Sequence, residues 1–193
     1  NVRLPSGDDR SGGDLEMWFW LERGEAVPPP AGEVNWDVYG VDRVDFLDPV
    51  RVRDTYDRDV MDLLYAGLVR LDAKMDVVPD LAERWDFDDE GTTLTVQLRQ
   101  DTFFSDGSPV TAEDAKFSLE RALNTIYGTT YLSAIDGINV VDEFTVELLS
   151  EAGFPRYFLS QLTTTPAKIV SMQAVGDNPD WDLDPVTLSL IHI

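Results

Sequence analysis

The chain has 193 residues, of which 43% are hydrophobic, and this is enough for one domain or two small domains with packed cores. It carries 37 acidic and 15 basic residues, a formal net charge of -22 that repels the phosphates of nucleic acids, so no nucleic-acid partner is expected. It has no cysteine, which excludes disulfides, thiol catalysis and cysteine-ligated metal sites.

Residues 1–32 have the composition of a tether or N-terminal strap. Gly7–Asp14 is rich in Gly and Asp, and Pro28–Pro30 is a triple proline, a composition typical of a linker between a membrane anchor and a folded body. The aromatic run Trp18–Trp20 is expected to pack on that body, and an exposed apolar patch is the alternative. The first residue is Asn1 and not Met, so we interpret the chain as an internal fragment.

Regular structure is expected to begin at Glu33, where apolar and polar residues alternate with the period of a half-buried strand. A helix is predicted from about Asp57 to Val69, because apolar residues then recur at helical spacing. These residues are Val60, Leu63, Leu64, Leu68 and Leu71. Gly67 inside this helix would cost about 1 kcal/mol relative to Ala, so we expect it to permit a close approach of two backbones.

Two β-hairpins are predicted further along the chain. Trp85 and Phe87 alternate with polar residues before the acidic loop Asp88–Gly91, and Leu94, Val96 and Leu98 alternate after it. The second hairpin turns at Asp142-Glu143, between the apolar pair Ile138 and Val140 and the apolar set Phe144, Val146 and Leu148. Trp85 is interpreted as a core aromatic residue because it begins an alternating strand. Strands linked by hairpins indicate an α+β arrangement.

A turn and a capped helix lie between the two hairpins. In the turn, Asp106 can accept hydrogen bonds from its own backbone and Gly107 can adopt a positive φ. Thr111 is the expected N-cap of a helix from Ala112 to about Asn124, with Asp114 in the reciprocal position of a capping box. The buried side of this helix is expected to contain Ala115, Leu119, Ala122 and Leu123.

Several short motifs in this order resemble family 5 of the extracytoplasmic solute-binding proteins, which deliver peptides, nickel or related solutes to ABC importers. The resemblance covers about Glu33 to Pro166. The matching segments are Leu47-Asp48-Pro49, Ala66-Gly67-Leu68, Pro79–Trp85, Leu98-Arg99 and Phe104–Asp114. The residues of these motifs are interpreted as structural, and Arg99 is expected to pair with a carboxylate.

The resemblance implies an α/β fold of the periplasmic-binding-protein-like type II, with an α+β outer subdomain. Residues 33–187 are then an incomplete lobe one of a two-lobed solute-binding domain. Residues 188–193, LSLIHI, resemble the translation of a transposon end used in preparing sequencing libraries. We interpret them, with the single histidine His192, as a sequencing-adaptor artefact. A native terminal strand is the alternative, because four of the six residues are apolar.

The resemblance also implies where the solute is contacted. In the family, contacts come from the loop after Leu-Asp-Pro, from a tyrosine shortly after the capped helix and mainly from the second lobe. By position, the ligand-binding residues in this sequence are Arg53, Asp54, Thr55, Tyr56 and Tyr131. Arg53 could meet a carboxylate and Asp54 an ammonium group, while the tyrosines could form the walls of a cleft. The alternative is that Arg53 and Asp54 form a surface ion pair and Tyr56 packs against the start of the helix.

The implied function is that of the substrate-binding component of an ABC importer, which captures peptides or a related small solute. The expected partners are the solute and the ABC permease complex in the membrane, and the expected state is a monomer. The expected location is extracytoplasmic, with a lipid anchor in the full-length protein. No cofactor or metal is expected. The competing hypothesis is a stand-alone extracellular binding or structural domain without a role in transport.

Catalysis is not expected, because nothing in the sequence isolates one pair of carboxylates from the others. Asp180, Asp182 and Asp184 imitate the opening of a calcium loop, but Pro185 stands where that loop needs glycine. The acidic excess consists mostly of Asp and the basic residues mostly of Arg. A saline habitat explains this composition as a hypothesis, and a GC-rich coding bias is the alternative.

Overall fold

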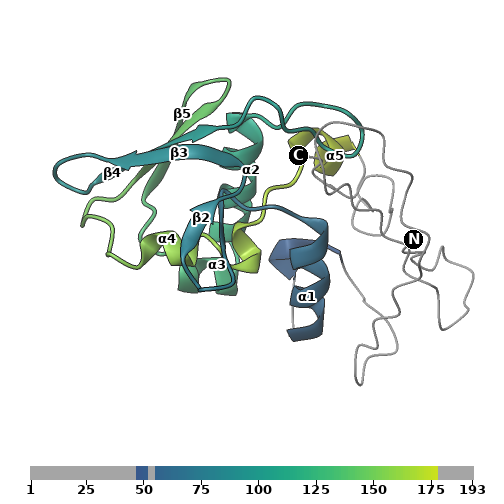
Figure 1. The fold of residues 1–193 in the computed structure, drawn as a ribbon, viewed down its shortest axis with the longest axis horizontal. Coiled ribbons are helices and arrows are strands. Elements are labelled where there is room, and N and C mark those ends of the chain that lie inside the picture. The colour runs from purple at the N-terminus through teal and green to yellow at the C-terminus, as the bar shows by residue number, and fades with distance from the viewer. Residues whose placement is uncertain (1–46, 52–54, 178–193) are drawn as a thin grey trace, which may run out of the picture. The chain divides into compact units, whose positions relative to one another are not determined.

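Both predicted hairpins are present, and together they form one four-stranded antiparallel sheet (Figure 1). The computed structural model describes residues 47–51 and 55–177, which belong to one compact unit. The strands are β3 (Ala82–Phe87), β4 (Thr93–Leu98), β5 (Gly137–Asp142) and β6 (Thr145–Leu149). Their order in the sheet is β3-β4-β6-β5, so the second hairpin pairs with the first through β6 and β4.

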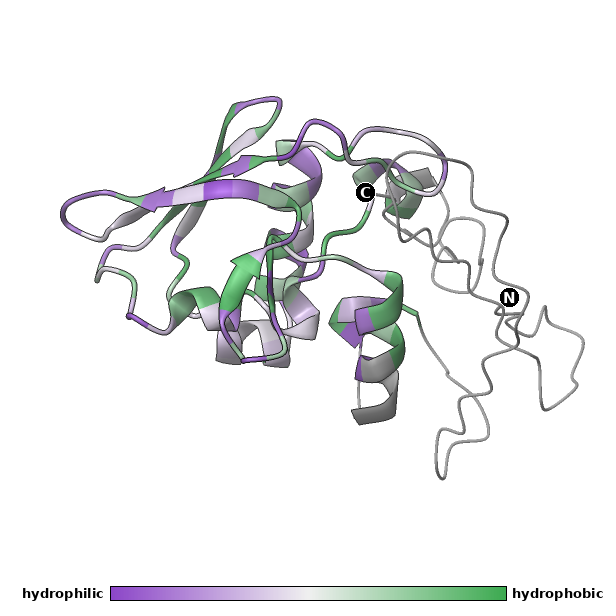
Figure 2. Ribbon diagram, in the orientation of Figure 1, coloured by the Kyte–Doolittle hydropathy of each residue, from purple (hydrophilic) through white to green (hydrophobic). Residues whose placement is uncertain are grey.

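The alternation in the strands separates a buried face of the sheet from a polar one. On β4 and β6, Leu94, Val96, Val146 and Leu148 are at most 2% exposed, and Val96 lies opposite Val146. Trp85 lies opposite Val96 and packs against the same core, as predicted. Figure 2 shows the tip of the β3–β4 hairpin as hydrophilic, in agreement with its acidic sequence.

Helix α2 (Ala112–Leu123) packs against this sheet and begins with the predicted capping box. The Thr111 hydroxyl accepts a hydrogen bond from the Asp114 backbone N–H, and the Asp114 carboxylate accepts one from the Thr111 backbone N–H. These bonds satisfy N–H groups that have no partner inside the helix. Ala115, Leu119 and Ala122 are fully buried, while Leu123 is only partly buried.

The predicted helix from Asp57 to Val69 is correct at its start and wrong at its end. Helix α1 spans Thr55–Leu64, and the chain then forms β1 (Val69–Leu71), which pairs with β2 (Val77–Pro79) in a small antiparallel sheet. Gly67 lies between α1 and β1, and its backbone N–H donates to the Asp80 carboxylate at 3.0 Å. A Cβ at Gly67 would lie 3.1 Å from the Val69 carbonyl oxygen, so the expected close approach of backbones is present outside a helix.

The remaining elements are short. They are the 3-10 turns η1 (Pro49–Arg51) and η2 (Thr165–Ala167) and the helices α3 (Ile126–Tyr131), α4 (Phe158–Gln161) and α5 (Met172–Asp177). Residues 165–171 are all buried, and they lead from η2 to α5 as the yellow end of the ribbon in Figure 1. The Ile169 backbone N–H donates to the Ala66 carbonyl, and Lys168 bridges to Gly67. This segment therefore ties the C-terminal part of the body to the end of α1.

The strand expected from Glu33, residues 1–32 and the terminal segment 188–193 lie outside the described residues. In the part of the chain that is described, no helix combines the length and the hydrophobicity needed to cross a bilayer.

Candidate functional site

The ligand-binding residues proposed from the sequence lie on two separate segments. Arg53 and Asp54 lie outside the described residues, and Thr55 and Tyr56 are the first two residues of α1, whose first side chains are not described. Tyr131 is the last residue of α3 and is 36% exposed. Both α1 and α3 pack against η2. The helix that begins at Thr55 and the helix that ends at Tyr131 thus share a neighbour.

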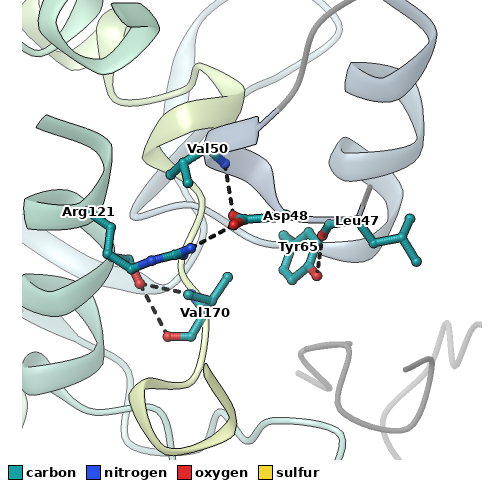
Figure 3. A network of polar contacts seen from close by, with 7 residues as sticks. Leu47, Asp48, Val50, Tyr65, Arg121 and Val170 are labelled. Atoms are coloured by element: carbon teal, nitrogen blue, oxygen red, sulfur yellow. Dashed lines mark hydrogen bonds and ion pairs between the residues drawn. The ribbon is translucent and has the colours of Figure 1, made fainter. Parts of the chain in front are cut away.

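The segment before α1 is held firmly by buried polar groups. The Asp48 carboxylate accepts a hydrogen bond from the Val50 backbone N–H at 3.1 Å and pairs with Arg121 at 2.6 Å, as Figure 3 shows. The Tyr65 hydroxyl donates to the Leu47 carbonyl oxygen at 2.7 Å. Asp48 is 3% exposed, so this ion pair is shielded from water on the carboxylate side. Side-chain bonds therefore fix the Leu-Asp-Pro motif to Tyr65 after α1 and to Arg121 of α2.

Helix α3, which sequence reasoning missed, begins directly after α2 and carries Tyr131. Its N-cap is Thr125, whose hydroxyl accepts from the Gly128 backbone N–H at 3.1 Å. Gly128 is buried, and a Cβ at this position would overlap the carbonyl group of Ala122. Only glycine permits this approach of α3 to α2. The signal in the sequence was the Thr-x-x-Gly step from Thr125 to Gly128, directly after α2.

The outer surface of α3 is uncharged and largely apolar. Ile126 is 82% exposed, and Tyr127 and Tyr131 are spaced by four residues and so lie on one side of the helix. The hydroxyls of Thr129 and Thr130 donate to backbone carbonyls within the helix. No charged residue occurs from position 122 to position 135, although 27% of the chain is charged. This surface is suited to contact an uncharged or aromatic part of a solute.

A group of charged side chains lies where α1, β1 and the buried residues 165–171 meet. The Lys168 ammonium is 3.3 Å from the exposed Asp62 carboxylate, and Asp80 lies 4.0 Å from Arg70. Burial raises the pKa of Asp80 above its usual value of 3.8, although the hydrogen bond from Gly67 and the nearby Lys168 charge oppose that shift. Burial dominates because Arg70 is half-exposed and at the limit of ion-pair distance, and because Lys168 is shared with Asp62.

Other motif residues have the structural roles that the sequence suggested. Arg99 pairs with Asp101 at 3.2 Å, as expected. Asp106 accepts hydrogen bonds from the Ser108 hydroxyl and backbone N–H, and Gly107 has a φ of 86°. Among the described residues, no group of three or more His, Cys, Asp or Glu side chains is arranged to hold a metal ion.

The same fold occurs in known binding proteins. The family described as "Bacterial extracellular solute-binding proteins, family 5 Middle" matches residues 76–188. The glutathione-binding protein GsiB of Salmonella typhimurium is 33% identical over 132 residues, which are 67% of this chain and 26% of the relative. The periplasmic oligopeptide-binding protein OppA of Escherichia coli is 25% identical over 156 residues, covering 69% of this chain and 28% of the relative.

The chain is also similar to a binding protein whose structure has been solved. The periplasmic binding protein AgaA from A. tumefaciens R10, in complex with agropinic acid, is 31% identical, with a TM-score of 0.65 over 70% of this chain and 28% of the other. The chain thus spans about a quarter of the length of the relatives it matches. Their names describe proteins that bind solutes. The chain belongs to family 5 of the bacterial extracellular solute-binding proteins.

Proposed function

We propose that the chain is part of the substrate-binding component of an ABC importer, which captures peptides or a related small solute and delivers it to a membrane permease. The observation that carries this proposal is the family match over residues 76–188, more than half of the chain. The relatives named above are described as binding glutathione and oligopeptides, and a further relative is a dipeptide-binding protein of Lactococcus lactis. These three names share the peptide as solute class, whereas AgaA is described in complex with agropinic acid.

In this proposal, Arg53, Asp54, Thr55, Tyr56 and Tyr131 contact the solute. Support comes from the exposed aromatic surface of α3 and from its lack of charge within an acidic chain. A peptide carries amide groups, terminal charges and side chains of many kinds, so a receptor needs polar partners together with aromatic walls of low selectivity. Arg53 and Asp54 supply the charges for the two termini, and Tyr131 supplies a wall.

The proposal places the protein outside the cytoplasm, with a lipid anchor in the full-length protein. Support comes from the description of the family as extracellular and of OppA as periplasmic. Residues 33–187 form part of lobe one, and the solute is enclosed when a second lobe closes on it. Such closure shifts populations only through contacts that are better in the closed state.

Uptake by whole cells tests the proposed transport role. The gene is deleted in its source organism, and the uptake of labelled dipeptides, oligopeptides and glutathione is measured. The proposal predicts that uptake of at least one of them falls and returns when the gene is restored. Unchanged uptake, together with peptide binding by the purified gene product, would support the stand-alone extracellular domain without a transport role.

A further inference from the structure

Helix α3 carries two tyrosines next to each other on its surface. Tyr127 and Tyr131 are spaced by four residues and therefore lie on one side of the helix. Tyr127 is 46% exposed and Tyr131 is 36% exposed. We call these two residues the tyrosine pair. The resemblance to the family indicated Tyr131 alone, so the proposed function gives no role to Tyr127.

Helix α3 is fixed at both of its ends, so the tyrosine pair is held in place. At the start, the Thr125 hydroxyl accepts a hydrogen bond from the Gly128 backbone N–H at 3.1 Å and donates one to the Ala122 carbonyl at 2.7 Å. At the end, Leu132 follows Tyr131 and is fully buried. A surface that is ordered before binding loses little conformational entropy when a ligand contacts it.

Helix α3 offers no charge to a charged part of a solute. No charged residue occurs from position 122 to position 135. The basic residues of the preceding helix α2 are already paired with carboxylates, Arg121 with Asp48 at 2.6 Å and Lys116 with Glu120 at 3.9 Å. A solute carboxylate or ammonium group would lose hydration at the tyrosine pair and find no opposite charge on α3. The pair is therefore suited to an uncharged part of the solute.

The polar groups of α3 leave the tyrosine rings as the main contact surface. The hydroxyls of Thr129 and Thr130 both donate to the Ile126 carbonyl, at 2.9 Å and 2.8 Å, so their protons are already used. The Ile126 side chain, which is 82% exposed, extends the apolar area beside Tyr127. A tyrosine combines an apolar ring with a hydroxyl that can bond to an amide group. This combination fits a peptide that carries an apolar side chain.

We propose that Tyr127 is a specificity-determining residue for the solute: together with Tyr131 it packs against a large apolar side chain of a bound peptide. This inference rests on the proposed function. Glutathione carries an acidic γ-glutamyl group and a small thiol side chain, so it offers the tyrosine pair no large apolar side chain. A peptide with an aromatic or large aliphatic residue is therefore bound more tightly than glutathione.

The test uses the complete gene product and a series of alanine tripeptides in which each residue in turn is replaced by phenylalanine, lysine or glutamate. Their dissociation constants are measured by calorimetric titration. At one position of the peptide, phenylalanine should bind at least about tenfold more tightly than alanine, because a large apolar side chain is removed from water. Lysine and glutamate should bind no more tightly than alanine there. In the variant Tyr127→Ser, the preference for phenylalanine should fall below about threefold, because half of the tyrosine pair is lost.

Two further variants serve as controls. Tyr127→Phe keeps the ring and removes only the hydroxyl, so it should retain the preference for phenylalanine over alanine. Tyr157→Ser removes a tyrosine that is 63% exposed and lies just before α4, outside the tyrosine pair. It should leave every dissociation constant unchanged. Thermal unfolding shows that each variant is folded at the temperature of the titration.

The outcomes separate this inference from the proposed function. If peptides bind but phenylalanine is not preferred, or if Tyr127→Ser keeps the preference, the inference is overturned while peptide capture stands. Tighter binding of lysine than of phenylalanine, lost in Tyr127→Ser, would show that the rings select a cation and would overturn the apolar solute class.

Two other results also overturn the inference. If Tyr127→Ser leaves every dissociation constant unchanged but lowers the melting temperature or the sedimentation coefficient, another part of the protein or a second copy covers the tyrosine pair. If the folded wild-type protein binds no peptide at all, the proposed function fails together with the inference.

Discussion

A Cβ atom at Gly128 would overlap the carbonyl group of Ala122, so only glycine fits at this position. The contact brings α3 against the end of α2 and leaves Tyr127 and Tyr131 facing outward. Backbone carbonyl atoms of a helix cannot move aside as a flexible side chain can. The position of the aromatic surface of α3 therefore depends on one missing methyl group.

Replacing Gly128 with alanine is expected to destabilise the protein by about 3 kcal/mol, because α3 must move away from α2 or distort. Denaturant unfolding of the purified protein measures this change. Gly176 is the matched control: it lies in α5 with open space around its Cβ position, so Gly176→Ala should be neutral or stabilising by up to about 1 kcal/mol. Equal effects at both positions would contradict the close contact.

Asp80 is expected to make the protein less stable as its carboxyl group ionises. Its pKa is raised by burial, so the folded state binds the proton more tightly than the unfolded state does. The stability that comes from the protonated form is fully present below the unfolded value of 3.8 and is lost as the pH rises through the folded pKa. Asp80→Asn keeps an oxygen for the Gly67 N–H and does not titrate. The free energy of unfolding of this variant, minus that of the wild type, should increase from pH 3 to pH 7.

The control for that measurement is Asp80→Ala, which removes the acceptor of the Gly67 N–H. It should destabilise the protein by about 1–3 kcal/mol, because a buried donor is left without its partner. A difference between Asp80→Asn and the wild type that is constant with pH, or that decreases, would show that burial does not control this carboxyl group.

The contribution of Asp106 to stability is expected to depend on pH in the opposite direction to that of Asp80. Hydrogen bonds from the Ser108 hydroxyl at 2.6 Å and the Ser108 backbone N–H at 2.8 Å lower the pKa of Asp106 below 3.8. Its contribution to stability is therefore present above pH 3.8 and disappears as the pH falls through the lowered pKa. Asp106→Asn should be less stable than the wild type at pH 6 and should approach it at pH 2. Thermal unfolding at pH 6 and pH 2 measures the difference in stability between the variant and the wild type. A difference that is larger at pH 2 than at pH 6 would contradict the lowered pKa of Asp106.

The large negative charge predicts that salt stabilises the folded protein. With a net charge of -22, like charges repel more strongly in the compact state than in the unfolded state. Raising NaCl from 0.1 M to 1 M shortens the Debye length from about 10 Å to about 3 Å, so the melting temperature should rise at pH 7. Near the isoelectric point of about 4.1 the net charge vanishes, and the rise should be much smaller there. The same rise at both pH values would indicate a general salt effect and not screening.

The sequence predicted the elements whose signals are local. The hairpin of β3 and β4 and the capping box of Thr111 and Asp114 depend on residues within a few positions of one another, and both are present. The end of α1 was mispredicted because Gly67 bonds to Asp80 and bridges to Lys168, contacts that lie 13 and about one hundred positions away. Long-range pairing of this kind overrides helical periodicity.

In the candidate site, too, features with a local sequence signal were predicted and features that depend on long-range contacts were not. The family resemblance indicated Tyr131, but nothing local revealed that it ends a helix held by the contact between Gly128 and Ala122. The ion pair of Asp48 and Arg121 joins residues 73 positions apart, so neither residue alone suggested the other. Whether Tyr131 contacts solute stays a prediction.

Calorimetric titration of the complete gene product with dipeptides, oligopeptides and glutathione tests the proposed capture of peptides most directly. The account predicts saturable binding of at least one of these solutes with one site per chain, and a dissociation constant at least tenfold higher for Tyr131→Ala because an aromatic contact is lost. Tyr157→Ala, which removes an exposed aromatic side chain just before α4, is the control and should leave the dissociation constant unchanged. Absence of binding to every peptide and to glutathione by a folded protein would contradict the account.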